Sequence, residues 1–198
     1  MKQLKHEQGT DEWIQARIGV PSASMFKKII TSQGRRSTSM NDYIYSLAAE
    51  KITGKRVEVK VTDAMAKGTE REPMAREEFE LLTDLEVTET GFILHDSETF
   101  GCSPDGLIGD DSGLEIKCPA DNTHLRWLDA GKIPSDHFAQ VQGCMLVTER
   151  DHWHFYSYHP DMKPLHVVVE RDDSYLSLLI ELLGEVNQKI NELVEKAK

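Results

Sequence analysis

Three residues near the middle of the chain, Asp105, Glu115 and Lys117, have the types and spacing of a site that cleaves phosphodiester bonds. Asp105 follows a proline, and Glu115 and Lys117 come about ten residues later, separated by one apolar residue. Two carboxylates suit a hard divalent cation, and an ammonium group can orient or deprotonate a water molecule. The group therefore predicts a metal-dependent phosphodiesterase, while an exposed hairpin with scattered charges is the alternative for so short a motif.

The residues between these side chains predict a β-hairpin, because turn formers stand between two apolar pairs. With a loop of either three or five residues, Asp105 is expected opposite Lys117, and Leu107 opposite Glu115. Strand alternation then turns Asp105, Glu115 and Lys117 to one face of the sheet. Ile116 would point into the core on the other face, and its carbonyl oxygen would be a further metal ligand if the strand is locally unpaired.

Apolar periodicity and capping residues predict an alternation of helices and strands along the rest of the chain. Helices are expected near residues 39–53, 63–82, 136–146 and 172–193, and strands near residues 86–94, 152–159 and 165–170. This order predicts one domain over residues 1–198 with an α/β or α+β fold.

The composition excludes several classes of protein. No apolar segment approaches the length that spans a membrane, and the first residues lack the apolar run of a signal peptide, so we expect a cytoplasmic protein that does not bind membranes. The three cysteines form no Cys-x-x-Cys pair, which argues against a disulfide framework and against structural zinc.

The charge of the chain is uneven. Its formal net charge is −11, an awkward value for a protein that binds a phosphate backbone, but the segment from Lys27 to Lys60 has eight basic residues against three acidic ones. A basic face on an acidic body can hold a phosphate backbone locally. A solvated helix face would have the same composition, so the segment indicates nucleic-acid binding only together with other evidence.

Two short helices near the N-terminus suggest an anion site. Thr10 can cap a helix that contains Trp13 and Arg17, and Ser22 can cap the next one. Arg17 and Ser24 would then meet at a helix N-terminus, where free N–H groups favour an anion such as a terminal phosphate. Routine capping by these residues is the alternative.

Several motifs follow one another along nearly the whole chain. They are Trp13-x3-Arg17-x-Gly19-Val20-x2-Ala23-Ser24, Gly68-x3-Glu72, Cys102-Ser103-Pro104-Asp105-Gly106, Gly113-Leu114-Glu115-Ile116-Lys117-Cys118-Pro119, Ala139-Gln140-Val141-Gln142 and Glu170-Arg171-Asp172. In this order they resemble the lambda exonuclease, or YqaJ-type viral recombinase, family. The resemblance implies an α/β fold with the restriction-endonuclease-like PD-(D/E)xK core, a central mixed β-sheet flanked by helices.

The resemblance implies two Mg²⁺ ions, which Mn²⁺ can replace, and ligands from four residues: Asp105, Glu115, the carbonyl of Ile116 and Glu72. Glu72 would hold a second metal or a water, although its charged neighbourhood by itself suggests a solvated helix face. Lys117 would orient or deprotonate the attacking water. Gln142 would support that lysine and the scissile phosphate.

The resemblance also implies residues that bind DNA. Those for the 5′-phosphate of the end being consumed are Arg17, Ser24 and Ser103. Met65 stands where the family places an apolar wedge that splits the terminal base pair. Arg35 or Arg36 would follow the DNA strand, but the loop that carries them differs from the family's pattern, which leaves this role open.

The function implied is that of a Mg²⁺-dependent, processive exonuclease that digests the 5′-ended strand of linear duplex DNA to mononucleotides. The 3′ overhang would pass to a single-strand DNA annealing protein during phage recombination, and the enzyme would form a ring-shaped homotrimer around DNA. A structure-specific or restriction-like endonuclease of the same fold is one alternative. A non-catalytic DNA-binding recombination module is another, which the complete Asp105, Glu115 and Lys117 set argues against.

Overall fold

The computed structural model describes residues 1–4, 10–56 and 63–198, with side chains described from residue 66 onward in the last range. In chain order the elements are β1 (Lys2–Gln3), α1 (Asp11–Gln15), the 3₁₀ helix η1 (Ala23–Lys28), α2 (Met40–Thr53), α3 (Asp63–Thr83), β2 (Ile93–Leu94), β3 (Gly101–Cys102), β4 (Gly106–Ile108), β5 (Ser112–Lys117), α4 (Asp121–Ala130), α5 (Ser135–Thr148), β6 (His152–His159), β7 (Met162–Glu170) and α6 (Asp173–Lys196).

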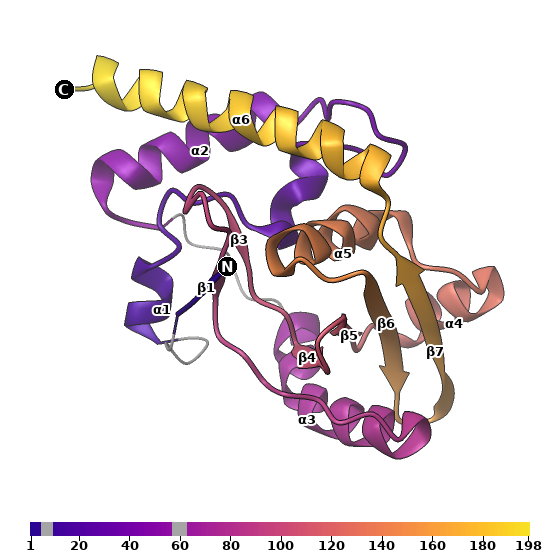
Figure 1. The fold of residues 1–198 in the computed structure, drawn as a ribbon. Coiled ribbons are helices and arrows are strands. Elements are labelled where there is room, and N and C mark those ends of the chain that lie inside the picture. The colour runs from indigo at the N-terminus through magenta and orange to yellow at the C-terminus, as the bar shows by residue number, and fades with distance from the viewer. Residues whose placement is uncertain (5–9, 57–62) are drawn as a thin grey trace.

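The strands form a four-stranded sheet in the order β4-β5-β6-β7 and a small three-stranded sheet in the order β1-β2-β3. β5 and β6 are parallel, whereas the other pairs of the larger sheet are antiparallel. The α/β fold class with a mixed sheet flanked by helices is therefore confirmed (Figure 1). The strand expected at residues 86–94 is shorter, with only Ile93 and Leu94 in β2 and an isolated bridge between Thr88 and Leu107.

Alternate residues of β6 divide the core between two helices. Trp153 and Phe155 belong to the main core, which includes the buried side chains of α5. Tyr156 packs with Phe79 of α3 and with Ile116 on the other face of the sheet. α3 and α5 thus cover opposite faces of the strand that carries Glu115 and Lys117, and Ile116 points into the core as predicted.

Several helix ends predicted from the sequence agree with the structure. The Thr10 hydroxyl accepts a hydrogen bond from the Trp13 amide at 3.3 Å, and the Asp172 carboxylate accepts one from the Tyr175 amide at 2.9 Å. Gly54 ends α2 with a φ of +65°. The helix after Ser22 is a short 3₁₀ helix without a side-chain cap, so the helix N-terminus expected beside Ser24 is only weakly formed.

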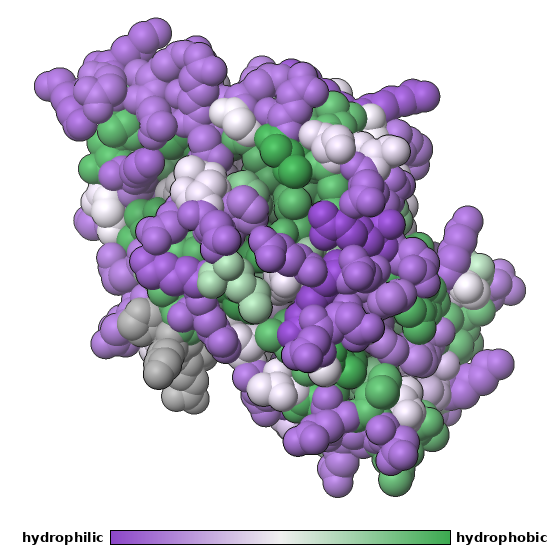
Figure 2. Space-filling view, in the orientation of Figure 1, coloured by the Kyte–Doolittle hydropathy of each residue, from purple (hydrophilic) through white to green (hydrophobic). Residues whose placement is uncertain are grey.

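α2 and α6 lie side by side, and α6 crosses the molecule beside the end of β7 (Figure 1). In the same orientation the surface is mostly hydrophilic, with several separate hydrophobic areas (Figure 2). Among the described residues no helix is both long enough and apolar enough to cross a bilayer.

The register of the hairpin differs by two residues from the one predicted. Leu107 pairs with Gly113 and Ile108 with Ser112, so the loop consists of residues 109–111. Gly109 begins the turn at a φ of +51°, which favours glycine. Because the shift is an even number of residues, each side chain keeps its predicted face.

Arg150 holds this turn. Its Nη1 donates to the carbonyl oxygens of Ile108, Gly109 and Ser112 at 3.0, 2.8 and 2.6 Å, and the side chain is buried. A guanidinium that binds carbonyls on both strands fixes where the turn begins, which local turn propensities alone do not determine.

We predict that Arg150→Met lowers the free energy of unfolding by about 2 kcal/mol or more, because three carbonyl groups lose a charged donor. The midpoint of urea denaturation measures this change. Arg126→Met on the exposed side of α4 is the matched control, with an expected change below about 0.5 kcal/mol. Equal midpoints for the two variants would show that the clamp does not stabilise the hairpin.

Candidate active site

The hairpin brings four of the expected site residues together. The Asp105 carboxylate accepts a hydrogen bond from the Ile116 amide at 2.6 Å. Glu115 is 1% exposed, and its Oε1 contacts the Lys117 ammonium, which also donates to the carbonyl oxygen of Ile116 at 3.1 Å. Asp105, Glu115, Ile116 and Lys117 therefore form one polar cluster at the end of β5.

Glu72 joins this cluster from α3. Its charge contributes to the raised pKa of Glu115, and the Asp105 charge contributes to the raised pKa of Glu72, so the three carboxylates interact electrostatically. Glu72 is not on a solvated helix face, which corrects the interpretation from its sequence neighbourhood alone.

Arg76, which the sequence analysis missed, lies one turn further along α3. It donates to Glu72 at 3.3 Å and to Glu89 at 2.6 Å. The i, i+4 spacing from Glu72 was the signal that could have found it.

Electrostatics set the charge state of the cluster. Burial raises the pKa of Glu115 to about 7, with Asp105 and Glu72 adding to the effect and Lys117 opposing it. Burial also raises the pKa of Asp105 and of Glu72. Burial alone would lower the pKa of Lys117, but the carboxylates outweigh it and raise the pKa, so the ammonium stays charged. The site therefore favours an added cation or proton.

The donor set fits a hard divalent cation. The described residues contain no group of three or more His, Cys, Asp or Glu side chains already arranged around one point. However, the candidate ligands are oxygens, and Glu115 Oε2 is buried without a hydrogen-bond partner. Lys117 contacts two candidate ligand atoms, Glu115 Oε1 and the Ile116 oxygen, so binding of a cation by those atoms requires the ammonium to move.

The two glutamines of α5 have different positions from those expected. The Gln142 side chain is completely buried, donates to the Glu170 carbonyl at 2.8 Å and accepts from the Asp172 amide at 3.0 Å, so it does not support Lys117. Gln140 instead donates to Glu115 Oε1 at 2.6 Å. The sequence places the two side chains on different faces of α5 but does not say which face meets the sheet.

Arg17 lies in an aromatic setting next to β2, whose partner strand β3 ends directly before Ser103. Its guanidinium carbon is 3.9 Å from the Trp13 ring centroid and 5.3 Å from that of Phe92, and the side chain is 8% exposed. Burial lowers the pKa of Arg17 to about 10. The Ser103 hydroxyl is buried without a hydrogen-bond partner, so both residues have donor capacity for an anion.

Ser24 is not joined to Arg17 by a hydrogen bond among the described residues. It is exposed, and its hydroxyl lies 3.3 Å from that of Ser22, whose amide donates to the Tyr43 hydroxyl. The expected meeting of Arg17 and Ser24 at a helix N-terminus is therefore only partly realised.

The other residues expected to contact DNA differ in whether their side chains already have a partner. One guanidinium nitrogen of Arg36, Nη2, donates to both carboxylate oxygens of Glu185 of α6 at 2.7 and 2.5 Å, and this ion pair competes with a role in following DNA. Arg35 is exposed, and its guanidinium has no partner in the described parts of the chain, so it is the better placed of the two. Met65 lies in the first turn of α3, and its side chain falls outside the described residues.

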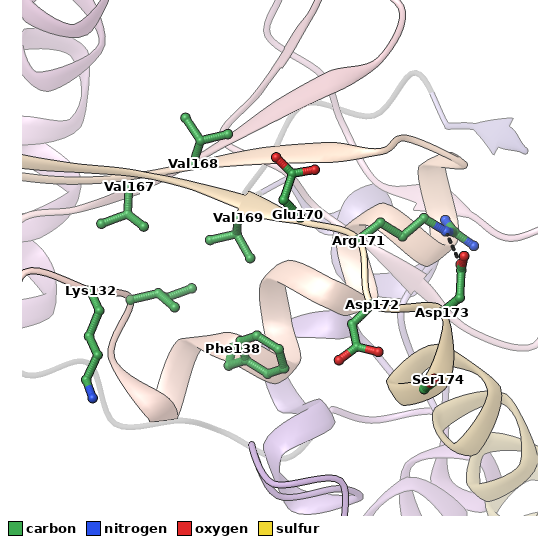
Figure 3. Close-up of a pocket in the computed structure, with 11 residues that line it drawn as sticks. Lys132, Phe138, Val167, Val168, Val169, Glu170, Arg171, Asp172, Asp173 and Ser174 are labelled. Carbon is green, nitrogen blue, oxygen red and sulfur yellow. Dashed lines mark hydrogen bonds and ion pairs between the residues drawn. The ribbon is translucent and has the colours of Figure 1, made fainter.

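A separate open pocket lies between β7 and the start of α5 (Figure 3). Phe138 and Val169 form part of its apolar wall, and an ion pair joins Arg171 to Asp173 at its rim. None of the clustered carboxylates lines it, so it is distinct from the candidate active site.

The mixed sheet, with carboxylates and a lysine on a hairpin beside a long helix, defines the restriction-endonuclease-like class of nuclease folds. Residues 12–151 match the family described as the YqaJ-like viral recombinase domain, and the chain belongs to that family, as its motifs predicted.

Solved structures agree with this assignment. An alkaline exonuclease, LHK-Exo from Laribacter hongkongensis, is 34% identical, with a TM-score of 0.82, and the match covers 95% of this chain and 98% of that one. LHK-Exo in complex with dAMP gives a TM-score of 0.83 at the same identity and coverage. A phage-related exonuclease from Haemophilus somnus 129PT shares the fold at 14% identity and a TM-score of 0.72, over 90% of this chain and 96% of that one.

A relative from Escherichia coli (strain K12), ExoD, is 43% identical over 63 residues, which is 30% of this chain and 72% of that protein.

We predict that millimolar Mg²⁺ raises the melting temperature by a few degrees, and more at about pH 8 than at about pH 5.5. The folded-state pKa of Glu115 is raised to about 7, so this group stabilises the fold at low pH, and the contribution is lost as the pH rises through 7. A cation bound to the ionised carboxylates offsets that loss of stability. Differential scanning fluorimetry in EDTA and in Mg²⁺ measures the effect.

The matched variants are Asp105→Asn and Asp110→Asn, which remove one carboxylate inside the cluster and one in the exposed turn of the same hairpin. Asp105→Asn should abolish most of the Mg²⁺ shift and should not lower the melting temperature in EDTA at about pH 8, because repulsion is relieved. Asp110→Asn should behave like the unmodified protein. An equal Mg²⁺ shift in both variants would contradict a cation site at Asp105.

Proposed function

We propose that this protein is a Mg²⁺-dependent 5′-to-3′ exonuclease that removes mononucleotides from the 5′-ended strand of linear duplex DNA and leaves a 3′ overhang. One observation carries the proposal. Ser103 and Asp105 are two residues apart, so their Cα atoms are at most about 7 Å apart. Asp105 belongs to the carboxylate cluster, whereas Ser103 directly follows β3, which pairs with β2 beside Phe92, the residue whose ring Arg17 approaches. A strand held by its terminal phosphate at one point would present the next phosphodiester at the other.

The residues of the chain have separate roles in this reaction. Arg17 and Ser103 bind the terminal phosphate. Asp105, Glu115, the Ile116 carbonyl and Glu72 would hold Mg²⁺, which would activate the attacking water and neutralise charge on the phosphoryl oxygens.

The carboxylate neighbours of Lys117 raise its pKa, and as a cation it would position the attacking water and the scissile phosphate. Gln140 fixes one oxygen of Glu115, and Arg76 holds Glu72 toward the site. The attacking oxygen forms a bond to phosphorus while the bond to the 3′ oxygen breaks. The product is a 5′-mononucleotide, and the shortened strand again ends in a 5′-phosphate, which the same pocket can bind.

The proposal includes a ring-shaped homotrimer around DNA and delivery of the overhang to a single-strand DNA annealing protein. The exposed apolar side chains of α3 support contact with another protein or another copy, since Leu81 is 83% exposed and Leu82 is 61% exposed. Encirclement of the product would explain processivity. We also propose that Mn²⁺ can replace Mg²⁺ and that the enzyme acts in the cytoplasm.

We predict that the protein digests linear duplex DNA in Mg²⁺ but not in EDTA, and prefers a 5′-phosphorylated end to a 5′-hydroxyl end. Lys117→Ala should reduce the rate about 100-fold or more, because a charged group that stabilises the transition state is removed. Release of nucleotides from end-labelled duplexes measures both effects.

A covalently closed plasmid distinguishes the proposal from an endonuclease of the same fold, because only an endonuclease would cut it. Digestion that persists in EDTA, or in Lys117→Ala at the unmodified rate, would contradict the mechanism. Absence of any cleavage would instead favour the non-catalytic binding module.

We predict opposite phenotypes for the two glutamines of α5. Gln140→Ala should lower kcat with little loss of stability, because Glu115 loses the donor that fixes its orientation. Gln142→Ala should lower the free energy of unfolding by about 1–3 kcal/mol, because the Glu170 carbonyl and the Asp172 amide lose their partners. Urea denaturation and single-turnover kinetics separate the two. The reverse pattern would restore Gln142 as the residue that supports Lys117.

A further inference from the structure

Two arginines approach the same indole ring. The guanidinium carbon of Arg17 lies 3.9 Å from the Trp13 ring centroid, and that of Arg56 lies 5.8 Å from the same centroid. Arg56 follows the end of α2 and is half-buried. Within the described ranges neither guanidinium takes part in an ion pair with a carboxylate. Two like charges therefore share one aromatic surface, and the charge of the buried Glu50 acts on Arg17, so an added anion would relieve the repulsion that remains.

Among the described residues, Trp13 Nε1 and Arg17 Nε are buried without a hydrogen-bond partner, and so is Ser103 Oγ, in the residue that follows β3 beside Phe92. A buried donor without an acceptor costs free energy, so several of them near two cations point to a ligand rich in acceptor oxygens. This observation is independent of the charge of the arginines. It indicates an anion with several oxygens rather than a chloride ion or a single carbonyl group.

The number of cations also bears on which anion fits. A terminal phosphate monoester carries a charge of about −1.5 to −2 near neutral pH, whereas an internal phosphodiester carries one charge. The charge of one guanidinium is enough to neutralise an internal phosphodiester. Only a terminal phosphate carries enough negative charge to neutralise a second guanidinium. Arg17 is held rigidly by Trp13 and Phe92, while the half-buried Arg56 retains more freedom to approach a bound anion.

We propose that Arg56 is a second arginine of the end-phosphate pocket, and that it makes the enzyme discriminate a terminal phosphate from an internal phosphodiester or a 5′-hydroxyl. This inference rests on the proposed function and adds a specificity-determining residue to it. Arg56 lies outside the motifs that predict the family but inside the basic segment from Lys27 to Lys60. In the complex, Arg17 and Ser103 bind the phosphate from within the fold, and Arg56 binds it from the segment after α2.

The test compares two duplexes that differ only in a 5′-phosphate or a 5′-hydroxyl. The ratio of their kcat/KM values gives the preference in Mg²⁺, and fluorescence anisotropy in EDTA gives the same comparison for binding without cleavage. Arg56→Ala should lower both preferences about tenfold, since a charge-assisted contact to the phosphate is lost. Arg56→Lys should recover part of the loss, because a point charge replaces a bidentate donor.

Lys55→Ala is the matched control, because it removes the same charge from the adjacent exposed position and should leave the ratio unchanged. An unchanged ratio in Arg56→Ala together with a reduced ratio in Arg17→Ala would overturn this inference and leave the proposed function intact. An unchanged ratio in Arg17→Ala as well would overturn the end-phosphate pocket itself. If Arg56→Ala does not fold, as judged by its melting temperature, Arg56→Gln provides the same comparison.

Discussion

Burial of several carboxylates beside one lysine is the constraint on which the rest of this structure depends. Glu115 is almost completely buried, and burial raises the pKa of Asp105, Glu72 and Glu115. An isolated buried carboxylate would be neutral or would destabilise the fold. Here Lys117 and the Ile116 amide compensate part of the negative charge. The remaining negative charge is one that a bound cation would neutralise, and the same imbalance requires a scaffold rigid enough to resist repulsion.

The scaffold meets this requirement by placing the charged strand between packed layers. β5 has β4 on one side and the parallel strand β6 on the other, and α3 and α5 cover the two faces. Gly113 lies directly against the Trp153 ring, where a Cβ atom would come within 2.3 Å of the indole. Arg150, in the loop between α5 and β6, fixes the turn. The positions of the carboxylates are therefore determined by contacts that are distant in sequence.

The separation of these contacts along the sequence explains which features of the structure could be predicted from it. Helix ends such as Gly54 and the alternation of Glu115, Ile116 and Lys117 depend on neighbours along the chain, and they agree with the structure. The hairpin register was wrong by two residues because the Arg150 contacts are non-local, yet the faces were right because alternation has a period of two. The resemblance assigned the support of Lys117 to Gln142, whereas Gln140 is the residue that contacts Glu115, and which face of α5 meets the sheet depends on tertiary packing.

In this arrangement the residues proposed to cleave the phosphodiester are separate from the residues proposed to select the DNA end. On the proposed function, the carboxylate cluster and Lys117 would hydrolyse a phosphodiester whichever way the strand runs, so they do not determine which end of the strand is consumed. That choice would lie in the Arg17 pocket, and the short Ser103–Asp105 backbone fixes its distance from the cluster. A change of side chain at Arg17 or Arg56 alters the affinity for an end but not this spacing. Related chains with the same cluster and a different pocket would therefore keep the hydrolytic chemistry and differ in the kind of DNA end they select.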